Sequence, residues 1–497
     1  MIHEGRCRSY DLMARGVMNM FNVDIARGLV VIEQRVRAVV GQRGWNAARK
    51  WLGGLVVSGV ILGLSSVAPA EQPGEDPVLP GYSNYLSDRF CTACHVKAVD
   101  QHSQSFHAQS HSDPLFKGQY FIELLPKVEQ EPELYEQEAK RCIACHSPVD
   151  SIAQDGRIVS EGQINTMLSG VGCSFCHTVA GYLGEAPGNG NYISNPDGDH
   201  HMLGPFMEKN DWHHVYSELH TKSEFCAICH NGSNRHGLEI KATFREWKNS
   251  IFAQNGIECQ DCHMNAKGFL LEWRSVYEDG PAVNPADSFV RAPNRPKLYT
   301  HRFPGAHSET QIVETGDIAL YIETEEPSIS PGDPLKITVY IDNSGTGHKM
   351  PSGSAELRQL WLELVAYNGY KRIPIPAMSL RADAYDVSGN GPLDQKILGE
   401  DIPAGSRIYR AILVDNTGKR TLSSYDAVSV LFDNRLNAAE LRKETYYFNV
   451  PDDIRGDITL KANLNYLPYP GSFARKFGLP KPATWNITSA SKTLPHK

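Results

Sequence analysis

The chain has 497 residues and a formal net charge of −8. The first 70 residues hold nine Lys and Arg against four Asp and Glu, so the rest of the chain is more acidic than the whole. This charge argues against nucleic acid or anionic lipid as a partner. Once the first 70 residues are set aside, the length is too great for one ordinary core and predicts two domains.

An apolar segment near the start is typical of a targeting sequence. It spans Trp51 to Val67, follows the basic residues Arg49 and Lys50, and ends in small residues at Ala70 before a polar stretch. We therefore predict a signal peptide with a long n-region in residues 1–70, cleaved after Ala70. The apolar run is near the lower limit for crossing a bilayer, so an uncleaved anchor remains the alternative.

The middle of the chain repeats one short motif. The pattern Cys-x-x-Cys-His occurs five times between Cys91 and His263 and holds ten of the eleven cysteines. Two thiols at this spacing can reach both vinyl groups of one porphyrin, and the next residue lies under the iron to supply an imidazole ligand. The pattern predicts five covalently bound c-type haems. Their thiols are those of Cys91, Cys94, Cys142, Cys145, Cys173, Cys176, Cys226, Cys229, Cys259 and Cys262, and their proximal iron ligands are His95, His146, His177, His230 and His263.

Two other interpretations of these cysteines explain less. A zinc site uses Cys-x-x-Cys units in pairs to obtain four ligands, and five units are an odd number with no need for a trailing histidine. Disulfides leave the histidines unexplained and give no reason for one identical short spacing. The remaining cysteine, Cys7, lies in the predicted leader, so the mature chain keeps no spare thiol, which suits an oxidising compartment.

The motif-bearing segment has few apolar runs and many Gly, Pro and His residues. A segment of this size with five haems cannot bury an ordinary side-chain core, so the porphyrins are expected to form the core. We predict a multihaem cytochrome c fold in which short helices and loops wrap stacked haems, with helical patterns at 132–139 and 242–255.

From about Gln311 the pattern changes to strands. Apolar runs, several with period-two alternation, are separated by Pro-Gly, Asn-Gly and Asp-Asn dipeptides that favour turns. Strands at this spacing without helices between them indicate an all-β immunoglobulin-like sandwich, here without a disulfide. The predicted domains are the leader at 1–70, a pentahaem cytochrome c domain at 71–308 and the β-sandwich at 309–497. The expected strands cover 318–322, 335–341, 360–365, 409–414, 445–450 and 458–462.

Each haem iron takes a second axial ligand or keeps an open position, and this choice separates an electron carrier from an enzyme. Beyond the leader the chain offers more than five histidines outside the motifs, enough for every haem to be bis-histidine. Methionine is the other possible ligand, at Met202, Met207 or Met350, although a packing role explains each of these better.

Two segments resemble a known family. Ser105-Phe106-His107-Ala108 after the first motif, and Tyr216 to His220 before the fourth, are similar to the tetrahaem cytochrome c that accepts electrons from hydroxylamine oxidoreductase, and to its multihaem relatives. The resemblance covers roughly residues 82–305, and this chain departs from it by one extra motif and by the added β-domain. It implies that His107 and His220 are distal ligands to other haems.

The resemblance also implies a third distal ligand at His200 or His201 and a further one at His301. The segment 345–353 resembles a Gly-His-x-x-Pro-Thr-Gly signature of β-domains attached to multihaem cytochromes, so His348 is either a ligand from across the interface or a turn residue. The full set of distal candidates is His107, His220, His201, His200, His301, His214 and His348.

These features predict an exported pentahaem cytochrome that carries electrons along closely packed, mostly bis-histidine haems. We expect other redox proteins as partners, such as a basic one or a membrane-bound quinol-linked complex, no nucleic acid, and membrane contact only if the leader is uncleaved. The expected location is the periplasm, with anchoring or an outer-surface position left open. The alternative is a periplasmic oxidoreductase of a small nitrogen or sulfur oxide at one five-coordinate haem; no catalytic residue is assigned.

Overall fold

The computed structural model describes residues 81–168, 170–197, 201–207, 214–283, 293–303, 305–306, 308–309, 312, 318–377 and 401–497. The predicted signal peptide, Cys7 and the candidate ligand His200 lie outside these residues. Residues Leu79–Lys497 form one compact unit, and the predicted boundary between 308 and 309 falls inside it. Within the ranges just given, no helix combines the length and the apolar character needed to cross a bilayer.

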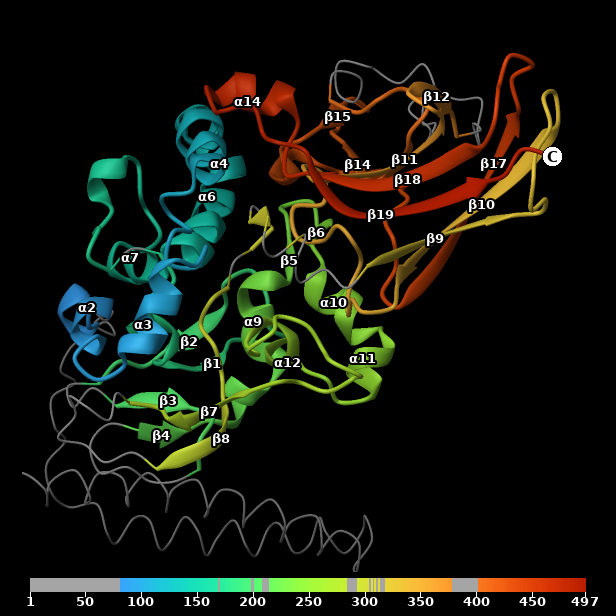
Figure 1. The fold of residues 1–497 in the computed structure, drawn as a ribbon. Helices are drawn as coiled ribbons and strands as arrows, with labels where there is room; N and C mark the ends of the chain where they lie inside the picture. Colours follow the sequence, from blue (N-terminus) through green and yellow to red (C-terminus); the bar gives the residue numbers. More distant parts are fainter. Residues whose placement is uncertain are drawn as a thin grey trace, which may run out of the picture. The chain divides into compact units, whose positions relative to one another are not determined.

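The first half of the described chain consists of short helices, shown from blue to green in Figure 1. The longest begins at Pro132, whose missing N–H costs nothing in a first turn, and buries Tyr135, Ala139 and Ile143 at four-residue spacing along one face. The α-helices of this half are α2 (Asp88–Cys91), α3 (Val96–Ser103), α4 (Pro114–Lys117), α5 (Leu125–Gln130), α6 (Pro132–His146), α7 (Pro148–Ala153), α8 (Cys173–Cys176), α9 (Ser223–His230), α10 (Thr243–Lys248), α11 (Ile251–Gln254) and α12 (Cys259–His263).

Both predicted helical patterns are confirmed, with changed limits. The pattern at 132–139 is the start of α6, which continues through the second motif. The pattern at 242–255 is two helices, α10 and α11, because the chain leaves the helix at Asn249 and Ser250 caps the next one by accepting from the Phe252 N–H. A π-helical stretch, η2 (Gly118–Leu124), joins α4 to α5.

Two-stranded strand pairs and 3₁₀ turns connect these helices. In the described part of this half, β1 with β2, β5 with β6 and β7 with β8 are antiparallel, and β3 with β4 is parallel. The bounds are β1 (Val179–Tyr182), β2 (Tyr192–Ser194), β3 (Met202–Gly204), β4 (His214–Tyr216), β5 (Gly232–Ser233), β6 (Glu239–Lys241), β7 (Glu278–Pro281) and β8 (Asn294–Leu298), with 3₁₀ turns η1 (Tyr82–Asn84), η3 (Glu161–Gln163) and η4 (Glu218–Thr221).

The second half is β-rich and contains several sheets. One sheet has the order β17-β10-β9, a larger one has the order β12-β11-β18-β19 with β13 also paired to β11, and a small one has the order β15-β14-β16. Figure 1 shows β11, β18 and β19 side by side. The strands are β9 (Ala319–Thr324), β10 (Pro334–Asn343), β11 (Gln359–Asn368), β12 (Lys371–Ile375), β13 (Arg407–Tyr409), β14 (Ala411–Val414), β15 (Arg420–Thr421), β16 (Ser429–Asp433), β17 (Glu440–Asn449), β18 (Ile458–Leu467) and β19 (Trp485–Leu494), with helix α14 (Gly471–Phe477) and the 3₁₀ turn η6 (Ser424–Asp426).

All six predicted strands are confirmed, the fourth of them as the consecutive strands β13 and β14. The two largest sheets share one apolar core, which includes Leu320, Ile337 and Tyr446 from one sheet and Leu362 and Leu464 from the other. The immunoglobulin-like topology remains a prediction.

The two halves share side-chain clusters. Phe473 and Phe477 of α14 pack with Leu115 of α4. Next to this contact a Cβ on Gly118 would lie 2.7 Å from the Phe477 ring, so only glycine allows the approach. The β-rich half is therefore packed directly onto the helices that surround the motifs.

Candidate haem-binding site

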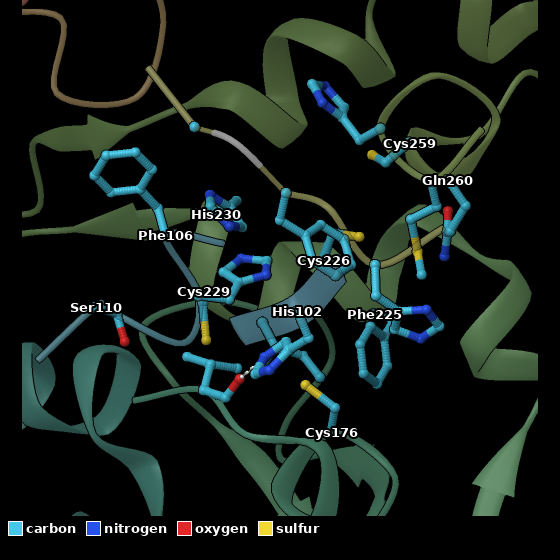
Figure 2. Close-up of a pocket in the computed structure, with 18 of the residues that line it drawn as sticks. His102, Phe106, Ser110, Cys176, Phe225, Cys226, Cys229, His230, Cys259 and Gln260 are labelled. Carbon is cyan, nitrogen blue, oxygen red and sulfur yellow. Dashed lines mark hydrogen bonds between the residues drawn. The ribbon is translucent and has the colours of Figure 1, made fainter. Parts of the chain in front are cut away.

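The five motifs open onto one cavity. Its volume is about 1650 Å³, and all ten motif cysteines and all five motif histidines line it. Figure 2 shows several of them around the space, among them Cys226, Cys229, His230 and Cys259. These ten cysteines form no disulfide. Free thiols and imidazoles gathered on one wall are the donor set that covalent c-type haems require, so the residues present fit the group.

The helices explain how each motif presents its three side chains. Residues i, i+3 and i+4 of a helix share one face, which is the spacing of Cys, Cys and His in the motif. The second, fourth and fifth motifs lie wholly within α6, α9 and α12. In the third motif α8 covers both cysteines and its C-terminal flanking residue is His177. In these four motifs one helical turn sends both thiols and the imidazole into the cavity. In the first motif Cys91 ends α2, a turn follows, and His95 comes directly before α3.

Three motif histidines have their rings fixed by a backbone carbonyl. The Nδ1 atom of His95 lies 2.9 Å from the Ala282 oxygen, and that of His146 lies 2.9 Å from the Ser110 oxygen. The third, His177, is held by the Leu203 oxygen at 2.6 Å. A carbonyl only accepts, so Nδ1 carries the hydrogen and Nε2 is left to bind iron.

Burial keeps several imidazoles of the cavity neutral. It lowers the pKa of His146 and of His263 to about 4, and neighbouring histidines add to the effect. The pKa values of His107, His220 and His301 fall to about 3 for the same reasons. Neutral imidazole is the form that binds a metal, so these rings are ready for ligation at neutral pH.

Three of the distal candidates face a motif histidine across the cavity. Two imidazoles bound to one iron at about 2 Å each have ring centroids roughly 6 Å apart. The observed centroid distances are 6.0 Å between His107 and His230, 6.4 Å between His301 and His177, and 6.2 Å between His348 and His263. The last pair is nearly parallel, with 7° between the ring planes. All three distances suit a haem iron held between two histidines.

The other candidates differ in their surroundings. The ring of His220 also lies near His177, at 5.7 Å; its Nε2 is 3.1 Å from the Cys176 oxygen and its buried Nδ1 has no hydrogen-bond partner. His214 lines the cavity, with Nε2 held 2.6 Å from the Phe206 oxygen. His201 is not among the lining residues: its ring is 46% exposed and bonded to Asp197 at 2.5 Å.

Thiols from different motifs lie close together. The Cys91 and Cys173 thiols, the Cys145 and Cys229 thiols, and the Cys226 and Cys259 thiols are near enough to shift each other's pKa. The thioether bonds of neighbouring haems would start from these sulfur atoms. Porphyrins attached there are therefore close neighbours, and the fold packs the motifs in pairs that are far apart in the sequence.

One buried histidine beside the cavity has a different environment, which sequence reasoning did not find. The ring of His102 is 6% exposed, with Nδ1 3.0 Å from an Asp88 carboxylate oxygen and Nε2 2.9 Å from the Val171 carbonyl oxygen. Neither oxygen donates a proton, so this environment favours the protonated form of the His102 ring. Asp88 also accepts from the Cys173 N–H at 2.8 Å, which ties the pair to the third motif. Nothing in the local sequence pairs residues 88 and 102.

This pair gives a testable dependence of stability on pH. Burial opposes the charge on His102, but Asp88 outweighs it and holds the His102 pKa above its ordinary value; hydrogen bonds to His102 and Cys173 likewise hold the Asp88 pKa below its own. The pair's stabilisation is thus fully present only between about pH 4 and 6.5, and is lost above the raised His102 pKa and below the lowered Asp88 pKa. We expect His102→Gln to reduce the free energy of unfolding by about 3 kcal/mol at pH 5.5 and by less at pH 9.

Urea unfolding at the two pH values measures this difference. The control is Lys97→Gln, which breaks an ion pair with Glu278 whose lysine is 67% exposed and which should change stability by less than about 1 kcal/mol. An equal loss for His102→Gln at both pH values would contradict a charged His102.

Comparisons with known proteins agree with this geometry. The family model described as cytochrome c554 and c-prime matches residues 90–178, which contain the first three motifs. The crystal structure of a penta-heme cytochrome c552 from Thermochromatium tepidum aligns with a TM-score of 0.57 at 20% identity, covering 83% of this chain and 99% of that chain. No curated protein sequence matches the chain.

Other solved structures align only with 36% of the chain. They include Spo0M, a sporulation control protein from Bacillus subtilis, at 8% identity over 49% of its chain, and the human F-spondin reeler domain, at 12% identity over 88% of its chain. Their TM-scores of 0.14 and 0.15 are too low to support an argument about the β-rich half. The family match over residues 90–178, the fold shared with a penta-heme cytochrome and the five motifs around one cavity together support a multihaem c-type cytochrome.

Proposed function

We propose that this protein is an exported pentahaem cytochrome that carries electrons between redox partners along closely packed, mostly bis-histidine haems. The observation that carries the proposal is the single cavity lined by all five motifs. Haems attached to one continuous wall, with thiols of different motifs close together, lie close enough for electrons to pass between them. The protein's own residues then set potentials through axial ligands, burial and hydrogen bonds.

In this proposal the ten motif cysteines hold the porphyrins and the five motif histidines are the proximal ligands. Three distal ligands follow from the ring distances: His107 opposite His230, His301 opposite His177, and His348 opposite His263. His220 and His214 line the same cavity and are the remaining described candidates.

Export and partners follow from the sequence features. The apolar segment before Ala70 supports a signal peptide and a periplasmic location, where c-type haems are attached. The acidic charge supports docking to a basic redox protein or to a quinol-linked membrane complex. We propose further that the two larger sheets form an immunoglobulin-like sandwich, since they enclose one common core.

Optical and EPR spectra of the oxidised protein test the proposal. We expect five haems per chain by pyridine haemochrome, mainly low-spin signals, and no spectral change when nitrite or hydroxylamine is added. Four haems or fewer would mean that a motif is unoccupied. A high-spin signal that shifts with either compound would overturn the carrier role and favour an enzyme.

One observation favours the enzyme alternative, an oxidoreductase of a small nitrogen or sulfur oxide at one five-coordinate haem. Among the residues that the structure describes, no histidine ring faces His146 at the spacing of the three pairs above; its ring neighbour is Phe116, stacked at 4.2 Å. The three ring pairs include neither His95 nor His146, so an open haem would belong to the first or the second motif. The ligand-binding spectra above distinguish the two functions.

A further inference from the structure

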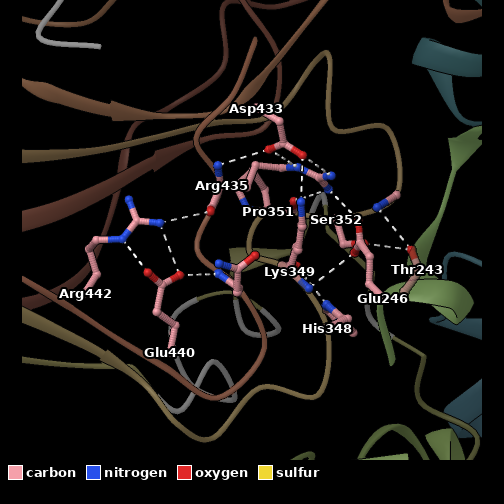
Figure 3. Close-up of polar contacts among 12 residues, drawn as sticks. Thr243, Glu246, His348, Lys349, Pro351, Ser352, Asp433, Arg435, Glu440 and Arg442 are labelled. Carbon is pink, nitrogen blue, oxygen red and sulfur yellow. Dashed lines mark hydrogen bonds and ion pairs between the residues drawn. The ribbon is translucent and has the colours of Figure 1, made fainter. Parts of the chain in front are cut away.

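The segment that carries His348 connects strands β10 and β11 and lies against the helices of the haem region. Figure 3 shows His348 beside a group of charged and hydroxyl side chains from both halves of the chain. The aromatic rings of Trp247 and Phe252 lie 3.5 Å from where a Cβ on Gly347 would stand, so this turn packs directly on α10 and α11. The candidate ligand His348 therefore belongs to the β-rich half of the chain.

A buried carboxylate holds this segment from the haem side. Glu246 of α10 has a side chain only 7% exposed. Its Oε2 accepts from the Ser352 hydroxyl at 2.6 Å and from the Lys349 backbone N–H at 3.3 Å. Its Oε1 accepts from Arg435 Nη1 at 2.7 Å. Both oxygens are therefore used, one on the segment and one on the arginine.

Arg435 holds the same segment from the β side. It follows strand β16, and its side chain is only 10% exposed. Its guanidinium donates to the Pro351 carbonyl at 3.1 Å and pairs with Asp433 at 2.9 Å. Asp433 also binds Lys349 Nζ at 2.8 Å. Glu246 and Arg435 therefore grip residues 349–352 from two sides.

The hydrogen bonds of Glu246 are connected to the His348 imidazole through the backbone of Lys349. Glu246 accepts from the backbone N–H of Lys349, and the carbonyl oxygen of Lys349 lies 2.9 Å from Nδ1 of His348. That hydrogen bond leaves Nε2 of His348 for iron and fixes the ring plane, which is 7° from the plane of His263. A shift of Lys349 would therefore turn or withdraw the ring.

We propose that Glu246 and Arg435 are positioning residues that orient His348 as an axial ligand, so that the β-rich half completes and tunes the haem of the fifth motif. The inference rests on the proposed assignment of His348 as that ligand. A buried ion pair is weak evidence of stability, because desolvation offsets much of its attraction. Orientation of a ligand is the role that its hydrogen bonds support, since partners behind a ligating histidine set its geometry and basicity.

The test uses the full chain with its haems attached and begins with His348→Gly. This variant should convert one haem from low spin to high spin in the EPR spectrum, and added imidazole should restore the low-spin signal. If every haem stays low-spin, the ligand assignment and this inference both fail, while the proposed electron-carrier function stands on its own spectra.

The second variant is Glu246→Leu, which keeps the bulk of the side chain and removes both hydrogen-bonding oxygens. We expect the low-spin signal and the midpoint potential of the same single haem to shift, with the other haems unchanged. Glu246→Gln keeps an acceptor oxygen for the segment and should recover most of the native signal. A merely structural role would move all haems or none.

The matched control is Glu444→Gln. Glu444 is a buried carboxylate in β17 that pairs with Arg407 at 3.0 Å and accepts from the Tyr409 hydroxyl at 2.9 Å, without touching residues 345–353. We expect this variant to keep the native EPR signals and potentials. The positioning role is overturned if Glu246→Leu leaves the affected haem unchanged, or if Glu444→Gln shifts that haem to the same extent.

Discussion

A chain in which alanine replaces all ten motif cysteines is expected to lose the helical half of its fold. Without haems the cavity of about 1650 Å³ would either stay dry or expose its largely apolar lining to water. Kept dry, a void of that volume would cost on the order of 40 kcal/mol at about 24 cal/mol per Å³, several times the roughly 5–15 kcal/mol that stabilises a folded domain. The packing of the helices around the motifs cannot offset a free energy of this size, so these helices should unfold or collapse.

Far-UV circular dichroism and limited proteolysis measure the loss. We expect the helical signal to disappear and the region between residues 81 and 309 to be cleaved rapidly, while β-structure persists, because the core of the two larger sheets is made of side chains. The control is the wild-type chain with haems attached. A cysteine-free chain with native helicity would show that porphyrins are not the core.

Replacing His107 with alanine is expected to convert one haem, that of the fourth motif, from low spin to high spin. The ring of His107 lies 6.0 Å from His230, and its backbone oxygen accepts from the Val171 N–H at 2.9 Å, which fixes its position. A Cβ on Gly170 would stand 2.4 Å from the Ala108 oxygen, so the two segments pack closely and hold the backbone beside His107 in place. His107→Met should keep the haem low-spin and raise its potential.

EPR spectra and potentiometric titration of the two His107 variants check this assignment. His236→Ala is the matched control, because His236 is exposed and does not line the cavity. The control should have a native spectrum. If His107→Ala also has a native spectrum, His107 is not a ligand, and the pairing of rings by distance loses its support.

The sequence predicts most successfully where the physics is local. Two thiols and an imidazole within five residues share one helical face, so the motifs were visible without a fold. The six expected strands have apolar, largely buried residues. Strands β16 and β19, and helix α14, were missed because β16 and β19 carry many exposed residues and α14 is short.

Distal ligands depend on the fold, so only candidates for them can be read from the sequence. His301 lies near His177, and His348 lies near His263, because segments far apart in the chain pack together. The distance between these residues along the sequence does not predict such pairs. His201, which the resemblance favoured equally with His200, lies among solvent-exposed groups instead. The pair of Asp88 and His102 and the grip of Glu246 on Lys349 are likewise contacts that only packing creates.

The short distances between thiols of different motifs affect the route that electrons can take between the proposed haems. The fourth motif lies near the second at Cys229 and Cys145 and near the fifth at Cys226 and Cys259, and Cys176 of the third lies near enough to raise the Cys226 pKa. If the proposed haems are attached to these sulfur atoms, the haem of the fourth motif has several neighbours, and the haems would form a branched network rather than a single file. Loss of an outer haem would then shorten one branch, whereas loss of the fourth-motif haem would separate the branches from one another.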